Sequence, residues 1–168
     1  MKRFLLVALV SMVTALGAHA SDRTARVGLS TSLLYERGWD AALLVERETR
    51  YHNAWEYFAN VYLKWEDCPS CGHVCPESFW HSYNTWNIGF AYKPMAYRSR
   101  NLVGRMRFGA SLGSDTDEVI GGIHLGYEQD YELRHGLVLF WQAKSDMIIN
   151  GRDLFRTGLA IGIKIPVK

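Results

Sequence analysis

Apolar and polar residues alternate with a period of two along most of this chain. Between residues 155 and 165 the odd positions are apolar apart from Thr157, and the even positions are glycine, alanine, arginine or lysine. Because successive side chains of a β-strand point to opposite faces, this stretch predicts a strand with one apolar and one small or charged face. Its apolar face can turn either to the core of a soluble protein or to membrane lipid.

The same alternation recurs in seven earlier segments, which cover residues 26–35, 41–51, 54–65, 83–93, 102–113, 119–128 and 137–146. About ten residues is the length that a tilted strand needs to cross a bilayer, and eight strands make the smallest usual outer-membrane barrel. We therefore predict an all-β fold, an eight-stranded antiparallel up-and-down transmembrane β-barrel. The side chains expected on its outer surface include Trp86, Phe108, Trp141 and Ile161.

The polar faces of these segments carry charges of both signs. They include Glu46, Glu48, Glu56, Lys64, Arg105, Arg107, Glu128, Lys144 and Arg156. In an eight-stranded barrel such side chains fill a narrow lumen, where opposite charges can neutralise one another. The alternative is a secreted soluble β-barrel, in which the apolar faces form the core and Arg105, Arg107 and Lys164 meet water.

The connections between the segments are expected to alternate in length. Short turns are predicted at 51–53, 98–101 and 134–136, and longer or more polar loops at 37–40, 66–82, 113–118 and 148–153. This alternation is typical of the periplasmic and extracellular ends of an outer-membrane barrel. His52, His124 and His135 have no neighbours at metal-ligand spacing, and we interpret them as turn or lumen residues.

Residues 1–20 have the features of a secretory signal peptide. Lys2 and Arg3 precede an apolar run, and Ala18-His19-Ala20 supplies a small-x-small cleavage site. We predict cleavage after Ala20 and a single domain over residues 21–168 in the outer membrane of a Gram-negative-type cell. The net charge of +2, with no basic block, argues against nucleic acid as a partner. No cofactor is expected, and a monomer is expected because a closed barrel has no free strand edge.

All three cysteines of the chain lie in the longest connection. Cys68, Cys71 and Cys75 occur within eight residues, together with His73. In an oxidising compartment, one disulfide with one remaining thiol is the favoured interpretation. A zinc site of Cys68, Cys71, His73 and Cys75 is the alternative, since spacings of two or three residues suit tetrahedral ligation.

Four short stretches give the chain a resemblance to a known family: "YLKW" at 62–65, "NIGFAYKP" at 87–94, "GGIHLGYE" at 121–128 and "KIP" at 164–166. On these stretches the chain resembles the outer-membrane lipid A 3-O-deacylases, small eight-stranded barrels that cleave an ester-linked acyl chain from lipid A. The resemblance implies lipopolysaccharide in the outer membrane as the lipid partner.

The signature of that family is His-x-Ser-Asn late in the barrel, then Asn-x-Gly and an acidic residue. The resemblance makes Ser145 the nucleophile and Asp153 the acidic residue, and it puts Asp146 in place of the asparagine. Ala143 stands at the position of the base, and a methyl group cannot accept a proton. Asp146 would also place negative charge where an oxyanion needs stabilisation. We therefore expect a deacylase-like barrel that is not an enzyme and that binds lipid A or has a structural role; an active lipid A 3-O-deacylase is the alternative.

Overall fold

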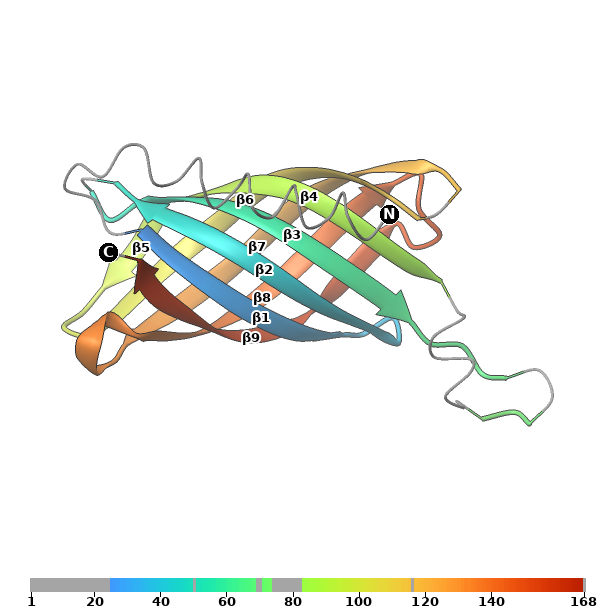
Figure 1. The fold of residues 1–168 in the computed structure, drawn as a ribbon, viewed down its shortest axis with the longest axis horizontal. Coiled ribbons are helices and arrows are strands. Elements are labelled where there is room, and N and C mark those ends of the chain that lie inside the picture. The colour runs from blue at the N-terminus through green and yellow to red at the C-terminus, as the bar shows by residue number, and fades with distance from the viewer. Residues whose placement is uncertain (1–24, 50, 69–70, 74–82, 116, 168) are drawn as a thin grey trace.

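The computed structural model describes residues 25–49, 51–68, 71–73, 83–115 and 117–167. Within these residues, nine strands form one antiparallel sheet that closes into an elongated barrel (Figure 1). The strands are β1 (Ala25–Leu34), β2 (Gly38–Glu48), β3 (Ala54–Lys64), β4 (Asn84–Lys93), β5 (Met95–Arg98), β6 (Leu102–Ser114), β7 (Val119–Glu132), β8 (Val138–Ile149) and β9 (Phe155–Val167).

The barrel closes because the first strand pairs with the last. Strand β1 pairs antiparallel with β9 over its whole length, from Ala25 opposite Val167 to Leu34 opposite Gly158. Strands β4 and β5 both pair with β6, on either side of Pro94, so together they occupy one position in the wall. The described barrel therefore has eight wall positions, and the predicted eight-stranded antiparallel fold is confirmed.

Strand β5 extends the wall beyond the end predicted from the alternation, which stopped at residue 93. Proline has no backbone N–H, so Pro94 cannot donate to the ladder and interrupts it. Pairing resumes with Met95 opposite Arg105, and the register shifts between Met95 and Tyr97. The irregularity is local, because the carbonyl of Pro94 still accepts a hydrogen bond from the N–H of Met106 at 3.0 Å.

The apolar face of the wall points outward. The large side chains expected there are exposed, among them Phe108 at 46% and Ile161 at 62%. By contrast, Arg105 and Lys164 lie in the lumen with 1% and 0% of their surface exposed. This arrangement contradicts the soluble-barrel alternative, which placed these two charges in water and the apolar residues inside.

The lumen is filled by side chains, as the small number of strands requires. Two apolar clusters lie inside it: one of Leu44, Phe58, Ala91 and Phe140, and another of Leu34, Tyr62 and Tyr83. Charged residues fill the space between and around them. Most of these form ion pairs, whereas the guanidinium of Arg156 stacks on the ring of Tyr62 at 3.7 Å and donates to the hydroxyl of Thr85 at 3.0 Å.

The two ends of the barrel differ. We call the end formed by residues 49–53, 99–101 and 133–137 the turn end, and the end formed by 35–37, 65–83, 115–118 and 150–154 the loop end. The connection between β3 and β4 leaves the barrel at the loop end, away from the C-terminus (Figure 1). It spans 19 residues, whereas every other connection between wall positions spans three to five.

The predicted alternation of loop lengths is therefore only partly right. The connection expected at 37–40 is a tight turn of residues 35–37, because Gly38 already belongs to β2. The longest connection does lie at the loop end, and the extracellular placement of that end stays a prediction. No helix among the described residues is long and apolar enough to cross a membrane.

Candidate functional site

The serine suggested by the family resemblance lies on the outer wall. Ser145 is half-buried on β8, and its hydroxyl lies 3.0 Å from that of Thr157 on the neighbouring β9. Ala143 and Met147 are its neighbours on the same face of the strand. This outer face of β8 therefore presents a hydroxyl pair and no imidazole.

The two acidic residues suggested with Ser145 lie elsewhere. Asp146 follows Ser145 directly, so the alternation of the strand turns its carboxylate into the lumen, where it is buried. Asp153 lies in the connection between β8 and β9, where it accepts from the ammonium of Lys64 at 2.5 Å and from the hydroxyl of Tyr62 at 3.1 Å. The structure thus does not bring Ser145, Asp146 and Asp153 together.

A different serine, histidine and aspartate do meet, inside the lumen. The Nε2 atom of His124 lies 2.7 Å from the hydroxyl of Ser111, and its Nδ1 atom lies 2.8 Å from Asp146. Asp146 stands directly opposite His124 in the β7–β8 pairing, while Ser111 comes from β6. The sequence predicted His124 in the lumen correctly, but its partners are visible only once the register of three strands is known.

This buried group has the connectivity of a catalytic triad but no room for a substrate. None of the three residues has more than 7% of its surface exposed. The cavity beside His124 and Asp146 has a volume of about 30 Å³, which accommodates about two water molecules. An acyl ester cannot enter such a space, so we interpret the group as a hydrogen-bond network that joins β6, β7 and β8.

Two adjacent glycines allow a matched test of this network. A Cβ atom at Gly122 would lie 2.6 Å from the Ser111 hydroxyl and 3.1 Å from His124 Nε2, whereas a Cβ at Gly121 would meet nothing within 4 Å. We expect Gly122→Ala to lower the free energy of unfolding by about 1–3 kcal/mol, because it disturbs a buried hydrogen bond. Gly121→Ala should change it by no more than ~0.5 kcal/mol. Urea unfolding followed by tryptophan fluorescence gives both values, and equal effects would contradict the network.

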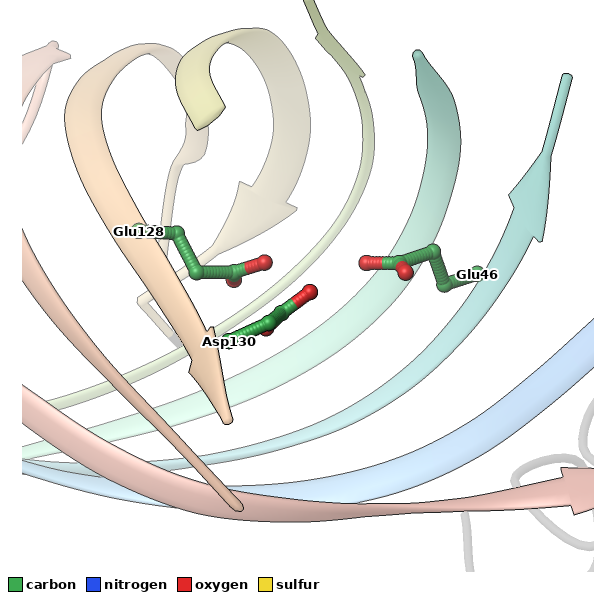
Figure 2. A group of neighbouring side chains, drawn as sticks. All are labelled: Glu46, Glu128 and Asp130. Atoms are coloured by element: carbon green, nitrogen blue, oxygen red, sulfur yellow. The ribbon is translucent and has the colours of Figure 1, made fainter. Parts of the chain in front are cut away.

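Three carboxylates converge at a second place in the lumen. Glu46 on β2 points toward Glu128 and Asp130 on β7 (Figure 2). Their ligand oxygens lie within 4.8 Å of one another, a spacing that could suit a metal ion. However, the ammonium of Lys164 lies 2.7 Å from Glu46, 2.6 Å from Glu128 and 2.8 Å from Asp130. A lysine thus supplies the positive charge that a metal would bring.

Further cations complete this ion-pair network across the lumen. The ammonium of Lys93 lies 3.0 Å from Glu46 and 2.7 Å from Glu128, and Arg105 pairs with Asp130. Both cations are buried. Most of the mixed charges predicted for the lumen are therefore paired, and this cross-section of the barrel is filled by side chains rather than by an aqueous channel.

The cysteine-containing loop is described only in part. Within it, the N–H of Cys68 donates to the carbonyl of His73 at 3.1 Å, and the thiol of Cys71 lies 3.5 Å from the same carbonyl. Among the described residues, the ligand atoms of Cys68, Cys71 and His73 do not form a group with metal-site spacing. Cys75 lies outside the described residues, so the disulfide and zinc alternatives both stay predictions.

The outer wall carries a groove of about 860 Å³ over β1, β8 and β9, near the loop end. Leu33, Leu159 and Ile161 line it, and the small side chain of Ala143 leaves it hollow. Ser145 adjoins the groove through its contact with Thr157, which is itself a lining residue.

An acidic residue that the sequence did not single out also lies in this groove. The two carboxylate oxygens of Glu36 lie 3.3 and 3.2 Å from the backbone N–H of Thr157. Glu36 belongs to the short turn between β1 and β2, more than 100 positions from Ser145 in sequence. Glu36 and Ser145 both lie beside β9 only because β1 and β8 pair with its two edges, and the β1–β9 pairing closes the barrel.

Comparison with known proteins supports the fold but not a family. No protein-family model matches the chain, and no curated protein matches it in sequence. Among solved structures, it is similar to a major outer membrane protein from Thermus thermophilus, with a TM-score of 0.63 and 10% identity over 88% of this chain and 100% of that one. It is also similar to Neisserial surface protein A, with a TM-score of 0.64 and 12% identity over 88% and 98%. The chain thus has the fold of small outer-membrane barrels, which supports an outer-membrane location.

Proposed function

We propose that this chain is an outer-membrane barrel that binds an acyl chain of lipid A on its outer wall and does not cleave it. The observation that carries the proposal is the groove over β1, β8 and β9. It is lined by Leu33, Leu159 and Ile161, lies at the loop end, and opens outward from the membrane-facing wall. An apolar groove in the extracellular half of the wall has the shape and chemistry to hold a hydrocarbon chain of the outer leaflet.

The arrangement of Ser145 supports binding without hydrolysis. A serine hydroxyl needs a neighbouring base to become a good nucleophile. The hydroxyl of Ser145 faces that of Thr157, while His124 lies on the lumen side of the wall. If hydrolysis did occur, Glu36 would be the candidate base, but a carboxylate accepts a proton less readily than an imidazole at neutral pH.

Charges at the loop end suggest how the headgroup of lipid A would be held. The described carboxylates there are Glu36, Glu66, Asp67, Asp115, Asp117, Glu118 and Asp153, against the cations Arg37 and Arg152. An acidic rim repels phosphate groups directly but can share divalent cations with them. The N–H of Glu118 donates to Asp115 at 2.9 Å and holds the pKa of that carboxyl below its usual range, so this carboxyl stays ionised in mild acid. We therefore expect binding to depend on Mg²⁺ or Ca²⁺.

Binding is tested by placing a large side chain at Ala143, which lines the groove. We expect Ala143→Phe to weaken lipid A binding about tenfold, since a displaced chain loses contact over about two methylenes at ~0.8 kcal/mol each. Ala110→Phe is the matched control, because Ala110 also faces outward, on β6 away from the groove. Native mass spectrometry of the refolded barrel, titrated with lipid A in Mg²⁺, measures the bound fraction. Equal binding by both variants would contradict the proposal.

The absence of cleavage is tested separately. Expression in a Gram-negative host with intact lipid A should leave the lipid A mass spectrum unchanged. Loss of one hydroxyacyl chain would instead establish the lipid A 3-O-deacylase alternative, provided that Ser145→Ala abolishes the loss. In that case Glu36→Gln should also abolish it, because no other proton acceptor is placed beside the Ser145–Thr157 pair among the described contacts.

A further inference from the structure

The turn end of the barrel carries exposed positive charge, in contrast to the acidic loop end. Arg98 and Arg100 lie at and after the end of β5, and Arg134 lies in the short turn between β7 and β8. All three are exposed. Three guanidinium groups at one rim form a surface with a strong preference for anions.

Arg98 is already engaged at this rim, because its guanidinium contacts His52, which in turn bonds to Glu48. The carboxylates of Glu48 and Glu132 are also engaged by a cation inside the lumen. Arg26 lies 3.2 Å from Glu48 and 2.8 Å from Glu132. Arg26 itself is buried. Within the described residues, no ion pair therefore joins Glu48 or Glu132 to the exposed Arg100 or Arg134.

The two turns that carry the arginines are held side by side. The N–H of Glu132 donates to the carbonyl of Asn101 at 2.9 Å, which ties the end of β7 to the turn before β6. Arg100 precedes Asn101, and Arg134 lies two residues after Glu132. Arg100 and Arg134 are therefore each attached to the backbone within two residues of this hydrogen bond.

Tyrosines lie on the same part of the outer wall. Tyr97 and Tyr131 each have 53% of their surface exposed, and they flank β6 from the two sides. Tyrosine at the edge of an apolar wall is typical of the interface between hydrocarbon and headgroups. The arginines therefore stand at headgroup depth, next to an apolar surface that acyl chains cover.

We propose that this rim surface, formed by Tyr97, Arg100, Tyr131 and Arg134, binds the headgroup of an anionic glycerophospholipid in the periplasmic leaflet. A guanidinium fork matches the oxygens of a phosphodiester, and the tyrosines contact the upper acyl chains. The proposal is independent of lipid A binding, because it concerns the opposite end of the barrel and a different lipid. It rests on charge complementarity and on the continuity of the rim with the lipid-facing wall.

The test uses brominated phospholipids, which quench tryptophan fluorescence on contact. The refolded barrel is placed in phosphatidylcholine vesicles that contain brominated phosphatidylglycerol or, for comparison, brominated phosphatidylcholine. Trp55, on the outer wall near this rim, is 42% exposed and reports on the adjoining lipid. We expect the wild-type barrel to prefer phosphatidylglycerol by roughly tenfold, and raised salt to weaken the preference.

The variant Arg100→Gln with Arg134→Gln should reduce this preference to within about twofold. The matched control is Arg37→Gln with Arg152→Gln, which removes two exposed arginines at the loop end and should leave the preference intact. Slower migration on boiling in detergent confirms that each variant is folded. A wild-type barrel without preference would overturn the proposal, and so would an equal loss in both double variants, which would indicate only net charge.

Discussion

Replacing Lys164 by methionine should lower the free energy of unfolding by about 3–5 kcal/mol, the usual cost of removing one partner from a buried ion pair. Methionine is similar in length but uncharged. Its presence would leave Glu46, Glu128 and Asp130 without the ammonium that contacts all three. Lys164 is fully buried, so water cannot take the place of the lost charge. Urea unfolding in lipid vesicles, followed by tryptophan fluorescence, measures the change.

A matched control lies at the loop end. Lys64 bonds to Asp153, but 21% of its side chain is exposed. Lys64→Met should therefore cost no more than about 1 kcal/mol. In the double variant Lys164→Met with Glu128→Gln, one of the excess negative charges is gone, and part of the stability should return. If Lys164→Met costs no more than Lys64→Met, the lumen does not hold this network.

The second large effect is expected on the outer wall. Ile161 lies at the middle of β9 and is 62% exposed. Arginine on the lipid face at the bilayer midplane costs about 2–4 kcal/mol, and near the interface only about 0–1 kcal/mol. We therefore expect Ile161→Arg to reduce stability and insertion sharply, whereas Leu154→Arg, in the turn before β9, should be tolerated. On the surface of a water-soluble barrel, both substitutions would be nearly neutral, so equal small effects would contradict a lipid-facing wall.

The wall of the barrel could be predicted from sequence because its signal is local. Each strand alternates apolar and polar residues, and the eight predicted segments overlap the observed wall positions. Residues 155–165, for example, lie inside β9 (Phe155–Val167). The choice of which face meets lipid also followed from composition: a narrow lumen needs small and paired charged residues, and the polar face supplies them.

Departures from the predicted strands have local physical causes. Pro94 ended the alternation, yet the chain beyond it pairs again as β5. Residues 37–40 were expected to form a loop because of their polarity, but Arg37 adopts a positive φ of 58° and completes a tight turn. A polar sequence is compatible with either outcome, so the pattern of residues alone could not decide.

The candidate sites could not be predicted, since they depend on register between distant strands. Ser111, His124 and Asp146 show no recognisable spacing in sequence and meet only in the lumen. Glu36 reaches Thr157 because the first and last strands of the barrel pair. The available signal was coarse: it made His124 a turn or lumen residue but named no partner for it.

The orientation of the wall is tested most directly by spin labels along β9. In a cysteine-free variant, a nitroxide is attached in turn at positions 155, 157, 159, 161, 163 and 165, and its collisions with oxygen and with a water-soluble nickel chelate are measured in vesicles. We expect oxygen to reach all six positions, with the nickel chelate excluded most strongly near 161 and less toward both ends, as for a strand that crosses a bilayer. High accessibility to the chelate at 161, or low accessibility to both reagents there, would show that this face meets water or a dry protein core, and would contradict the membrane barrel.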